Sequence, residues 1–132
     1  KLALLDVRNG QEIWSRPASS YNGPAIGGGA IYLSDANGDV IALRGNDRRQ
    51  LWVQDRLSWR QLTRPAVSGD YVVVGDFEGY LHVLSQRDGS LVGQEKVDSD
   101  GLRVPVQVLR NGDILVYSNG GRLATYRLQK DD

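Results

Sequence analysis

The stretch PAIGGGAIYLSDANGDVIALRGNDRRQLW, residues 24–52, recurs in altered form twice further along the chain. It aligns with PAVSGDYVVVGDFEGYLHVLSQRDGSLV at 65–92, and more loosely with PVQVLRNGDILVYSNGGRLATYRL at 105–128. The prolines that open the three copies are 41 and 40 residues apart. A second landmark, a glycine before a strand-like run, keeps separations of 41 and 42 at Gly38, Gly79 and Gly121. Two independent landmarks therefore indicate one internal repeat.

Each copy holds short runs rich in Val, Ile, Leu and Tyr, separated by Asn-Gly, Asp-Gly or Glu-Gly pairs. Such pairs are typical of tight turns between antiparallel strands. No apolar pattern of helical period continues over three turns anywhere in the chain. The sequence therefore predicts an all-β protein.

A period of 40 to 42 residues with about four strands per unit is typical of a β-propeller blade. Each blade is buried against its neighbours on both faces. This explains why YVVVG at 71–75 and VIAL at 40–43 are continuously apolar rather than alternating. A β-sandwich is the competing fold, but a sandwich would not require one landmark to recur at a fixed period. We therefore expect blades of four antiparallel strands.

Counting strands divides the chain into two full blades and two partial ones. We expect full blades at 22–54 and 63–97, the end of an earlier blade at 1–16, and three strands of a closing blade at 103–129. Propellers close with about four to eight blades, so this set makes an incomplete ring. Either the chain is the C-terminal piece of a longer protein, which we expect, or several chains complete one ring. In the first case the missing strand comes from the N-terminal segment of the parent protein, and the isolated fragment should self-associate.

The composition argues against several classes of function. Sixteen basic and sixteen acidic residues give a net charge of zero, which disfavours nucleic acid as a partner. The absence of Cys rules out disulfides and thiolate metal sites within the chain. Residues 44–64 carry six Arg and two Asp, whereas 65–101 carry seven acids and two bases; we interpret both as solvated loop faces.

One motif resembles a known repeat. LLDVRNGQEIW contains Asp6, Gly10 and Trp14 at the spacing of quinoprotein-type β-propeller repeats, in which these three residue types lock adjacent blades. Trp52 repeats the tryptophan, whereas Gly93 takes its place in the next unit. The repeat family therefore agrees with the predicted fold, with one departure.

A longer stretch carries a more specific resemblance. GDFEGYLHVLSQRDGSLVGQEKVDSDG at 75–101, together with the preceding RLSWRQLTRPAV, is similar to the C-terminal third of the BamB family. Members of this family are lipoprotein subunits of the machinery that folds β-barrel proteins into the bacterial outer membrane. The resemblance extends from Lys1 to about Gln129.

The resemblance implies a non-catalytic, eight-bladed scaffold on the periplasmic face of the outer membrane of a Gram-negative bacterium, without a cofactor. It implies a lipid anchor on a cysteine upstream of this chain, and as partners a periplasmic repeat domain of the central barrel subunit and nascent outer-membrane proteins. The family's main partner-binding loops lie upstream of Lys1, so no site residue is carried over. A quinone-dependent dehydrogenase and a ligand-binding or sensor propeller are alternatives, because fold alone does not separate these functions.

Asp76, Glu78 and His82 are residue types that could hold a metal or transfer a proton. The internal alignment favours another interpretation, because the position of His82 is occupied in the other units by small or apolar residues, namely Ala3, Ile41 and Ala124. We therefore expect a partly buried imidazole with a hydrogen-bond partner. Asp76 is expected to shape its turn, and Glu78 to be a turn residue.

The segment DANGD at 35–39 imitates the start of a calcium loop. Such a loop requires Gly at its sixth position and Glu at its twelfth, which here are Val40 and Asn46. We therefore expect Asp35 to shape a turn as well. No catalytic, cofactor-binding or metal-binding residue is predicted.

The three tryptophans differ in their place in the repeat. Trp14 and Trp52 share one repeat position, which favours packing between blades over stacking on a flat ligand such as a quinone. Trp59 falls between repeats and is flanked by Arg56 and Arg60, a composition typical of interaction surfaces. The alternative is that Trp59 covers a blade edge with the arginine stems packed on it. We predict Arg56, Trp59 and Arg60 as partner-binding residues.

Overall fold

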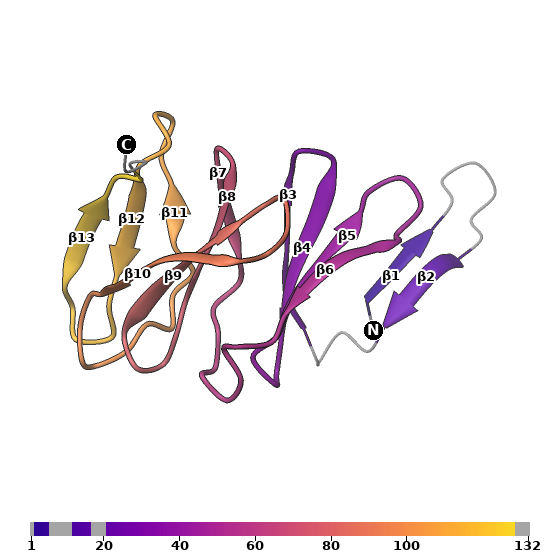
Figure 1. The fold of residues 1–132 in the computed structure, drawn as a ribbon. Helices are drawn as coiled ribbons and strands as arrows, with labels where there is room; N and C mark the ends of the chain where they lie inside the picture. Colours follow the sequence, from indigo (N-terminus) through magenta and orange to yellow (C-terminus); the bar gives the residue numbers. More distant parts are fainter. Residues whose placement is uncertain (1, 6–11, 17–20, 129–132) are drawn as a thin grey trace.

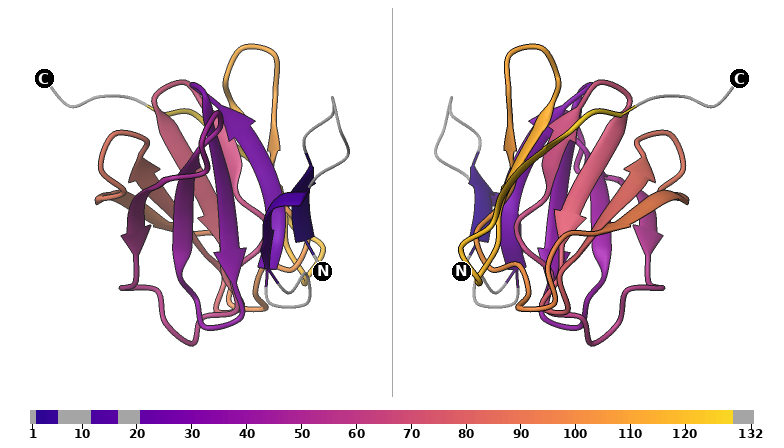
Figure 2. Two further views of the ribbon diagram at one scale, coloured as in Figure 1. Left: turned by 90° about the vertical axis from the view of Figure 1, so that its right-hand side faces the viewer. Right: turned by 90° about the vertical axis from the view of Figure 1, so that its left-hand side faces the viewer.

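The computed structural model describes residues 2–5, 12–16 and 21–128, and the secondary structure in these ranges consists of strands and turns. Each sheet is antiparallel, and its strands are neighbours in the order in which they occur in the sequence. The sheets follow one another along the molecule (Figure 1), and the side views show them stacked face to face (Figure 2). The predicted all-β fold with four-stranded blades is confirmed.

The four sheets have the following strands. A two-stranded sheet contains β1 (Leu2–Leu5) and β2 (Glu12–Arg16). The first full sheet contains β3 (Tyr21–Gly27), β4 (Ala30–Asp35), β5 (Val40–Arg44) and β6 (Gln50–Gln54). The second full sheet contains β7 (Ala66–Ser68), β8 (Tyr71–Gly75), β9 (Tyr80–Ser85) and β10 (Leu91–Lys96). A three-stranded sheet contains β11 (Gln107–Val108), β12 (Ile114–Tyr117) and β13 (Leu123–Tyr126).

The repeat seen in the sequence is also a repeat of strand register. Leu33 pairs with Ile41, Val74 with His82, and Val116 with Ala124, each pair spanning the turn between the second and third strands of its sheet. Each of these turns contains a glycine with a left-handed backbone, with φ of 92°, 95° and 89° at Gly38, Gly79 and Gly121. Glycine adopts this conformation without the steric cost that a Cβ brings. The turn residues therefore set the register.

Burial on both faces accounts for the apolar runs. Val72, Val73 and Val74 in β8 are all fully buried. Val72 and Val74 belong to a cluster shared with the first full sheet, whereas Val73 belongs to a cluster shared with the three-stranded sheet. Alternating side chains of one strand thus pack on two different neighbouring sheets.

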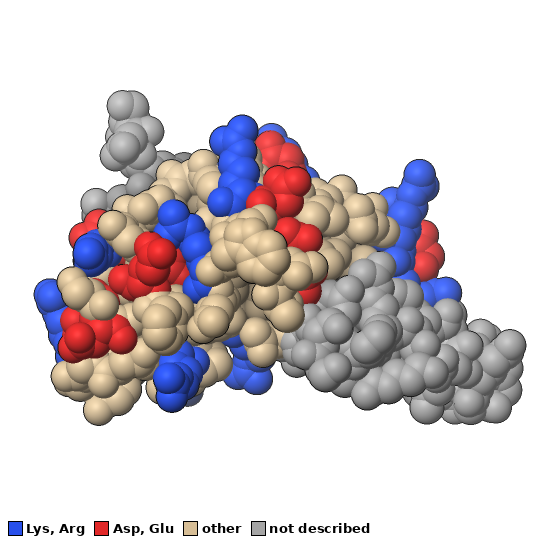
Figure 3. Space-filling model, turned by 90° about the horizontal axis from the view of Figure 1, so that it is seen from below, with Lys and Arg blue, Asp and Glu red and all other residues tan. Residues whose placement is uncertain are grey.

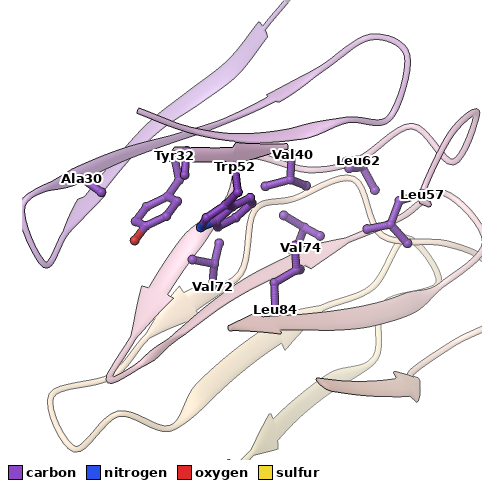
Figure 4. Close-up of a cluster of buried hydrophobic side chains, with 10 residues drawn as sticks. Ala30, Tyr32, Val40, Trp52, Leu57, Leu62, Val72, Val74 and Leu84 are labelled. Atoms are coloured by element: carbon purple, nitrogen blue, oxygen red, sulfur yellow. The ribbon is translucent and has the colours of Figure 1, made fainter. Parts of the chain in front are cut away.

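The core between the two full sheets contains the largest group of buried side chains (Figure 4). Trp52 from β6 lies in it with 8% of its surface exposed, and its ring centroid is 5.8 Å from that of Tyr32. The indole N–H donates a hydrogen bond of 2.8 Å to the carbonyl of Gln86 in the next sheet. A Cβ on Gly89 would come within 2.3 Å of the indole. Trp52 therefore packs between sheets, against a turn that must carry glycine.

The rest of the motif lies partly outside the described residues. Trp14 is in β2 and its backbone pairs with Leu4, but its side chain is outside the described part. Asp6 and Gly10 are also outside it. The packing predicted for Trp14 therefore stays a prediction.

Candidate interaction surface on the lower face

One end of the molecule, at the bottom of Figure 1, gathers the segments that leave and enter the sheets. We call this end the lower face. It is formed by three turns, at 35–39, 76–79 and 118–121, and by two linkers, at 55–65 and 97–106. Figure 3 looks onto it and shows basic and acidic side chains interspersed with uncharged surface.

Each linker is held between the turn of the sheet that it leaves and the turn of the sheet that it enters. In the first linker, the Trp59 N–H donates to the Asn37 carbonyl at 3.0 Å, and the Arg60 carbonyl accepts from the Phe77 N–H at 2.9 Å. In the second linker, the corresponding bonds are Val97 N–H to Gly79 O at 2.8 Å and Asn119 N–H to Gly101 O at 2.9 Å. These bonds give the linkers a fixed position although they lie outside the sheets.

The linkers also explain two of the repeat glycines. A Cβ on Gly38 would lie 2.2 Å from the Leu57 carbonyl oxygen, and a Cβ on Gly79 would lie 1.6 Å from that of Asp98. Gly121 has the same backbone conformation, but the nearest atom to its Cβ position is the Tyr117 hydroxyl at 4.0 Å. The first two positions therefore require glycine for close approach of a linker as well as for φ.

The side chain of Trp59, on the first linker, is exposed to solvent. Its side chain is 83% exposed, the largest exposed fraction among the described large apolar residues. Its φ is 66°, and that of Gln61 is 52°, a left-handed conformation that is uncommon for residues other than glycine. Such strain persists only where the surrounding contacts over-determine it, and it is often found at functional sites. Exposure of this extent does not fit the alternative in which Trp59 covers a blade edge.

Arg60 lies beside Trp59 in the sequence but is engaged in another contact. Its Nη1 is 3.2 Å from Asp76 Oδ2 and 3.6 Å from Glu78 Oε2, and its guanidinium lies 5.9 Å from the centre of the Tyr80 ring. Arg60 therefore joins the first linker to the second full sheet. Arg56 is exposed, and its backbone N–H donates to the Gln54 side chain.

Asp76 and His82 form a buried pair. Asp76 has no exposed surface, His82 is 1% exposed, and His82 Nε2 lies 2.7 Å from Asp76 Oδ2. The expected imidazole with a hydrogen-bond partner is present, more deeply buried than predicted. The second ring nitrogen, Nδ1, has no hydrogen-bond partner among the described residues. Because neither side chain reaches solvent, the pair has no access to a substrate, and its arrangement is that of a structural contact.

The electrostatics of Asp76 follow from its partners. Burial raises the pKa of its carboxyl group, but hydrogen bonds from His82, the backbone N–H of Tyr80 and Arg60 outweigh burial and leave the pKa below its ordinary value. Asp76 does shape its turn, since Oδ1 accepts from the Tyr80 N–H at 3.0 Å. Its second oxygen, Oδ2, has a further role that was not predicted, because it contacts the buried histidine and the linker arginine.

The equivalent positions in the other sheets show what is special to this one. Asp35 accepts hydrogen bonds from the backbone N–H groups of Asn37 and Asp39, as expected for a turn residue. Ser118 takes the same place in the three-stranded sheet, where its Oγ accepts from the Arg122 N–H and donates to Asp98 at 2.6 Å. Only the second full sheet, among the three, combines the turn acid with a histidine.

Two features of this face were not found from the sequence. Phe77 is 53% exposed in the turn next to the first linker, and a lone aromatic residue in a turn was its only sequence signal. Arg64 and Arg103 border a common cleft, and each lies one or two residues before a repeat proline, Pro65 or Pro105.

Among the described residues, no group of three or more acidic or histidine side chains could hold a metal ion. The same residues contain no helix suited to crossing a membrane.

The four-stranded sheets pack face to face and are joined by linkers that hydrogen-bond to the turns on both sides. This arrangement defines the chain as part of a β-propeller of the quinoprotein-like repeat class. The family model described as "Outer membrane protein assembly factor BamB" matches residues 1–131. The chain belongs to this BamB family.

Individual relatives agree with this assignment. The BamB of Marinobacter adhaerens is 61% identical over 132 residues, which are 100% of this chain and 34% of that protein. The BamB of Pseudomonas aeruginosa is 49% identical over 129 residues, 98% of this chain and 34% of that protein. The crystal structure of BamB from Moraxella catarrhalis superimposes with a TM-score of 0.81 at 25% identity, covering 94% of this chain and 36% of that one. The chain thus spans about a third of the length of these relatives.

Proposed function

We propose that this chain is part of a non-catalytic scaffold subunit that supports folding and insertion of β-barrel proteins at the periplasmic face of the outer membrane. Its relatives are named as an outer membrane protein assembly factor, not as an enzyme. The one histidine of the chain is buried in a structural pair with Asp76. Both facts favour action through protein contacts.

The observation that carries the proposal is Trp59. When a partner covers an aromatic side chain that is 83% exposed, a large apolar area is removed from water. Tryptophan is also enriched among the residues that dominate binding. Its linker is already fixed by hydrogen bonds to both neighbouring turns, so binding would cost little further ordering. We infer that Trp59, with the exposed Arg56 on the same linker and with Arg60 joining that linker to the second full sheet, contacts a periplasmic repeat domain of the central barrel subunit.

The test is Trp59→Ala in the full-length protein, with co-purification of the barrel subunit and the level of assembled barrel proteins as readouts. Leu51→Ala is the matched control, because Leu51 is an exposed apolar side chain on β6. We expect Trp59→Ala to reduce co-purification by about 10-fold, the size of a modest hot spot, and Leu51→Ala to leave it unchanged. Unchanged co-purification and unchanged barrel assembly in Trp59→Ala would reject the contact.

A further inference from the structure

A cleft of about 570 Å³ opens on the lower face between four separate segments of the chain. Asn22 belongs to β3, the segments at 61–64 and 102–105 lead into β7 and β11, and Phe77 lies in the turn at 76–79. β3, β7 and β11 are the first strands of three successive sheets, and they lie next to one another. The cleft therefore lies where the sheets converge. Its lining residues are Asn22, Gln61, Leu62, Thr63, Arg64, Phe77, Leu102, Arg103 and Pro105.

The charge of this cleft is one-sided. Arg64 and Arg103 are the charged side chains among its lining residues, and no aspartate or glutamate lines it. Both arginines are exposed, and neither forms an ion pair with a described residue. Arg60 and Arg127, by contrast, pair with carboxylates. The chain has equal numbers of acids and bases, yet these two guanidinium groups line a cleft without acidic residues. The anionic groups of a ligand can therefore pair with them.

The shape of the cleft and its remaining lining residues restrict the class of ligand that it can bind. A cleft of a few hundred Å³ is of the size that takes a short ligand segment. Phe77, 53% exposed, provides an aromatic surface at its edge, and Gln61 provides an amide on a backbone held at φ of 52°. Leu62 and Leu102 are already buried in the two core clusters. The cleft therefore offers an aromatic wall beside two cations, without an apolar channel that could take an acyl chain.

We propose that this cleft binds an extended acidic peptide segment of a partner protein, whose carboxylates pair with Arg64 and Arg103 and whose apolar side chain packs on Phe77. A guanidinium group matches a carboxylate through two parallel hydrogen bonds, which makes such pairs stronger than ordinary neutral ones. This inference deepens the proposed scaffold function, because it names the chemistry of a second contact on the same face.

The experiment measures binding of a fluorescein-labelled acidic peptide, with glutamates alternating with tyrosine and valine, to the full-length protein by fluorescence anisotropy. The same peptide with glutamine in place of glutamate, inorganic phosphate and phosphatidylglycerol vesicles serve as further probes. The variant is R64Q/R103Q. Its matched control is R87Q/R110Q, which removes the same charge from two exposed arginines in turns at the opposite end of the sheets.

We expect the acidic peptide to bind and R64Q/R103Q to weaken it by about 10-fold or more, whereas R87Q/R110Q changes it little. R64E/R103E should lose the acidic peptide and bind a lysine peptide of the same pattern, which shows that the variant is folded. Equal loss in both glutamine variants, or an arginine-dependent response to the vesicles or to phosphate without one to the peptide, would overturn the proposal. Because this readout is peptide binding and the Trp59 readout is co-purification, either inference can fail while the other stands.

Discussion

The two full sheets share one strand order and one register, yet their side chains stabilise them in different ways. In the first full sheet, Trp52 packs on Gly89 of the next sheet, and the third-strand position is Ile41. In the second full sheet, Gly93 replaces the tryptophan, and the third-strand position is His82, paired with Asp76. Gly93 borders a cleft of about 690 Å³ between this sheet and the three-stranded sheet.

The difference shows that the repeat fixes the backbone while leaving equivalent positions free to use apolar or polar contacts. The tryptophan contact connects strands and turns of two sheets. The polar contact of the second full sheet also recruits Arg60 from a linker, and so connects the core to the proposed interaction surface. Stability and surface geometry are therefore coupled in the second full sheet more directly than in the first.

The largest effect is expected from Trp52→Ala. Removing a buried tryptophan leaves a cavity and a lost hydrogen bond to the Gln86 carbonyl, and such changes cost about 3–5 kcal/mol of unfolding free energy. Denaturant unfolding of the protein measures it. Gly93→Ala in the second full sheet is the control and should cost far less, because the nearest atom to its Cβ position is Val83 Cβ at 3.5 Å. Similar losses in the two variants would contradict the comparison.

A smaller effect is expected from His82→Ile, which gives the second full sheet the residue of the first. Asp76 would then keep Arg60 but lose its buried partner at 2.7 Å, and a buried charge left short of a partner costs about 2 kcal/mol. Adding Asp76→Ser, which copies the turn of the three-stranded sheet, should recover most of this loss. The double variant compared with each single variant in unfolding experiments gives the coupling; additive losses would mean that the pair is not coupled.

Lowering the pH should narrow the difference in unfolding free energy between the unchanged protein and the Asp76→Asn variant. The folded-state pKa of Asp76 is below its ordinary value, so its contribution is present above the unfolded-state pKa of about 3.9 and is lost as the pH falls through the folded value. Unfolding free energies from pH 5 downward measure this narrowing. Asp98 and Asp113, whose pKa values hydrogen bonds also lower, are common to both proteins and cancel. A constant difference across this range would show that folding does not shift the pKa of Asp76.

The smallest effect on stability is expected at the linker between the two sheets. Trp59→Ala removes a side chain that is 83% exposed, so the unfolding free energy should change by no more than about 0.5 kcal/mol. Measured beside Trp52→Ala, it separates a tryptophan that packs from one that is presented to solvent. A loss as large as that of Trp52→Ala would mean that Trp59 is part of the core.

The features that the sequence predicts correctly depend on local chemistry or on the repeat. Asn-Gly and Glu-Gly pairs set the turns at Gly38 and Gly79, because only neighbouring residues decide a two-strand turn. The packing of Trp52 was predictable from its place in the repeat. The contact of Arg60 with Asp76 was not, because it joins residues 16 positions apart through a linker that has no regular pattern. The cleft at Arg64 and Arg103 depends on four segments that meet only in the folded chain.

The hydrogen bonds that hold the two linkers have a geometric consequence for how neighbouring sheets pack. Each linker fixes the distance between two successive turns on the lower face, while the core clusters fix the distance between the same sheets further up. Two fixed distances at different heights define a wedge angle between neighbouring blades. The linker hydrogen bonds and the core clusters together therefore hold neighbouring sheets at a defined angle.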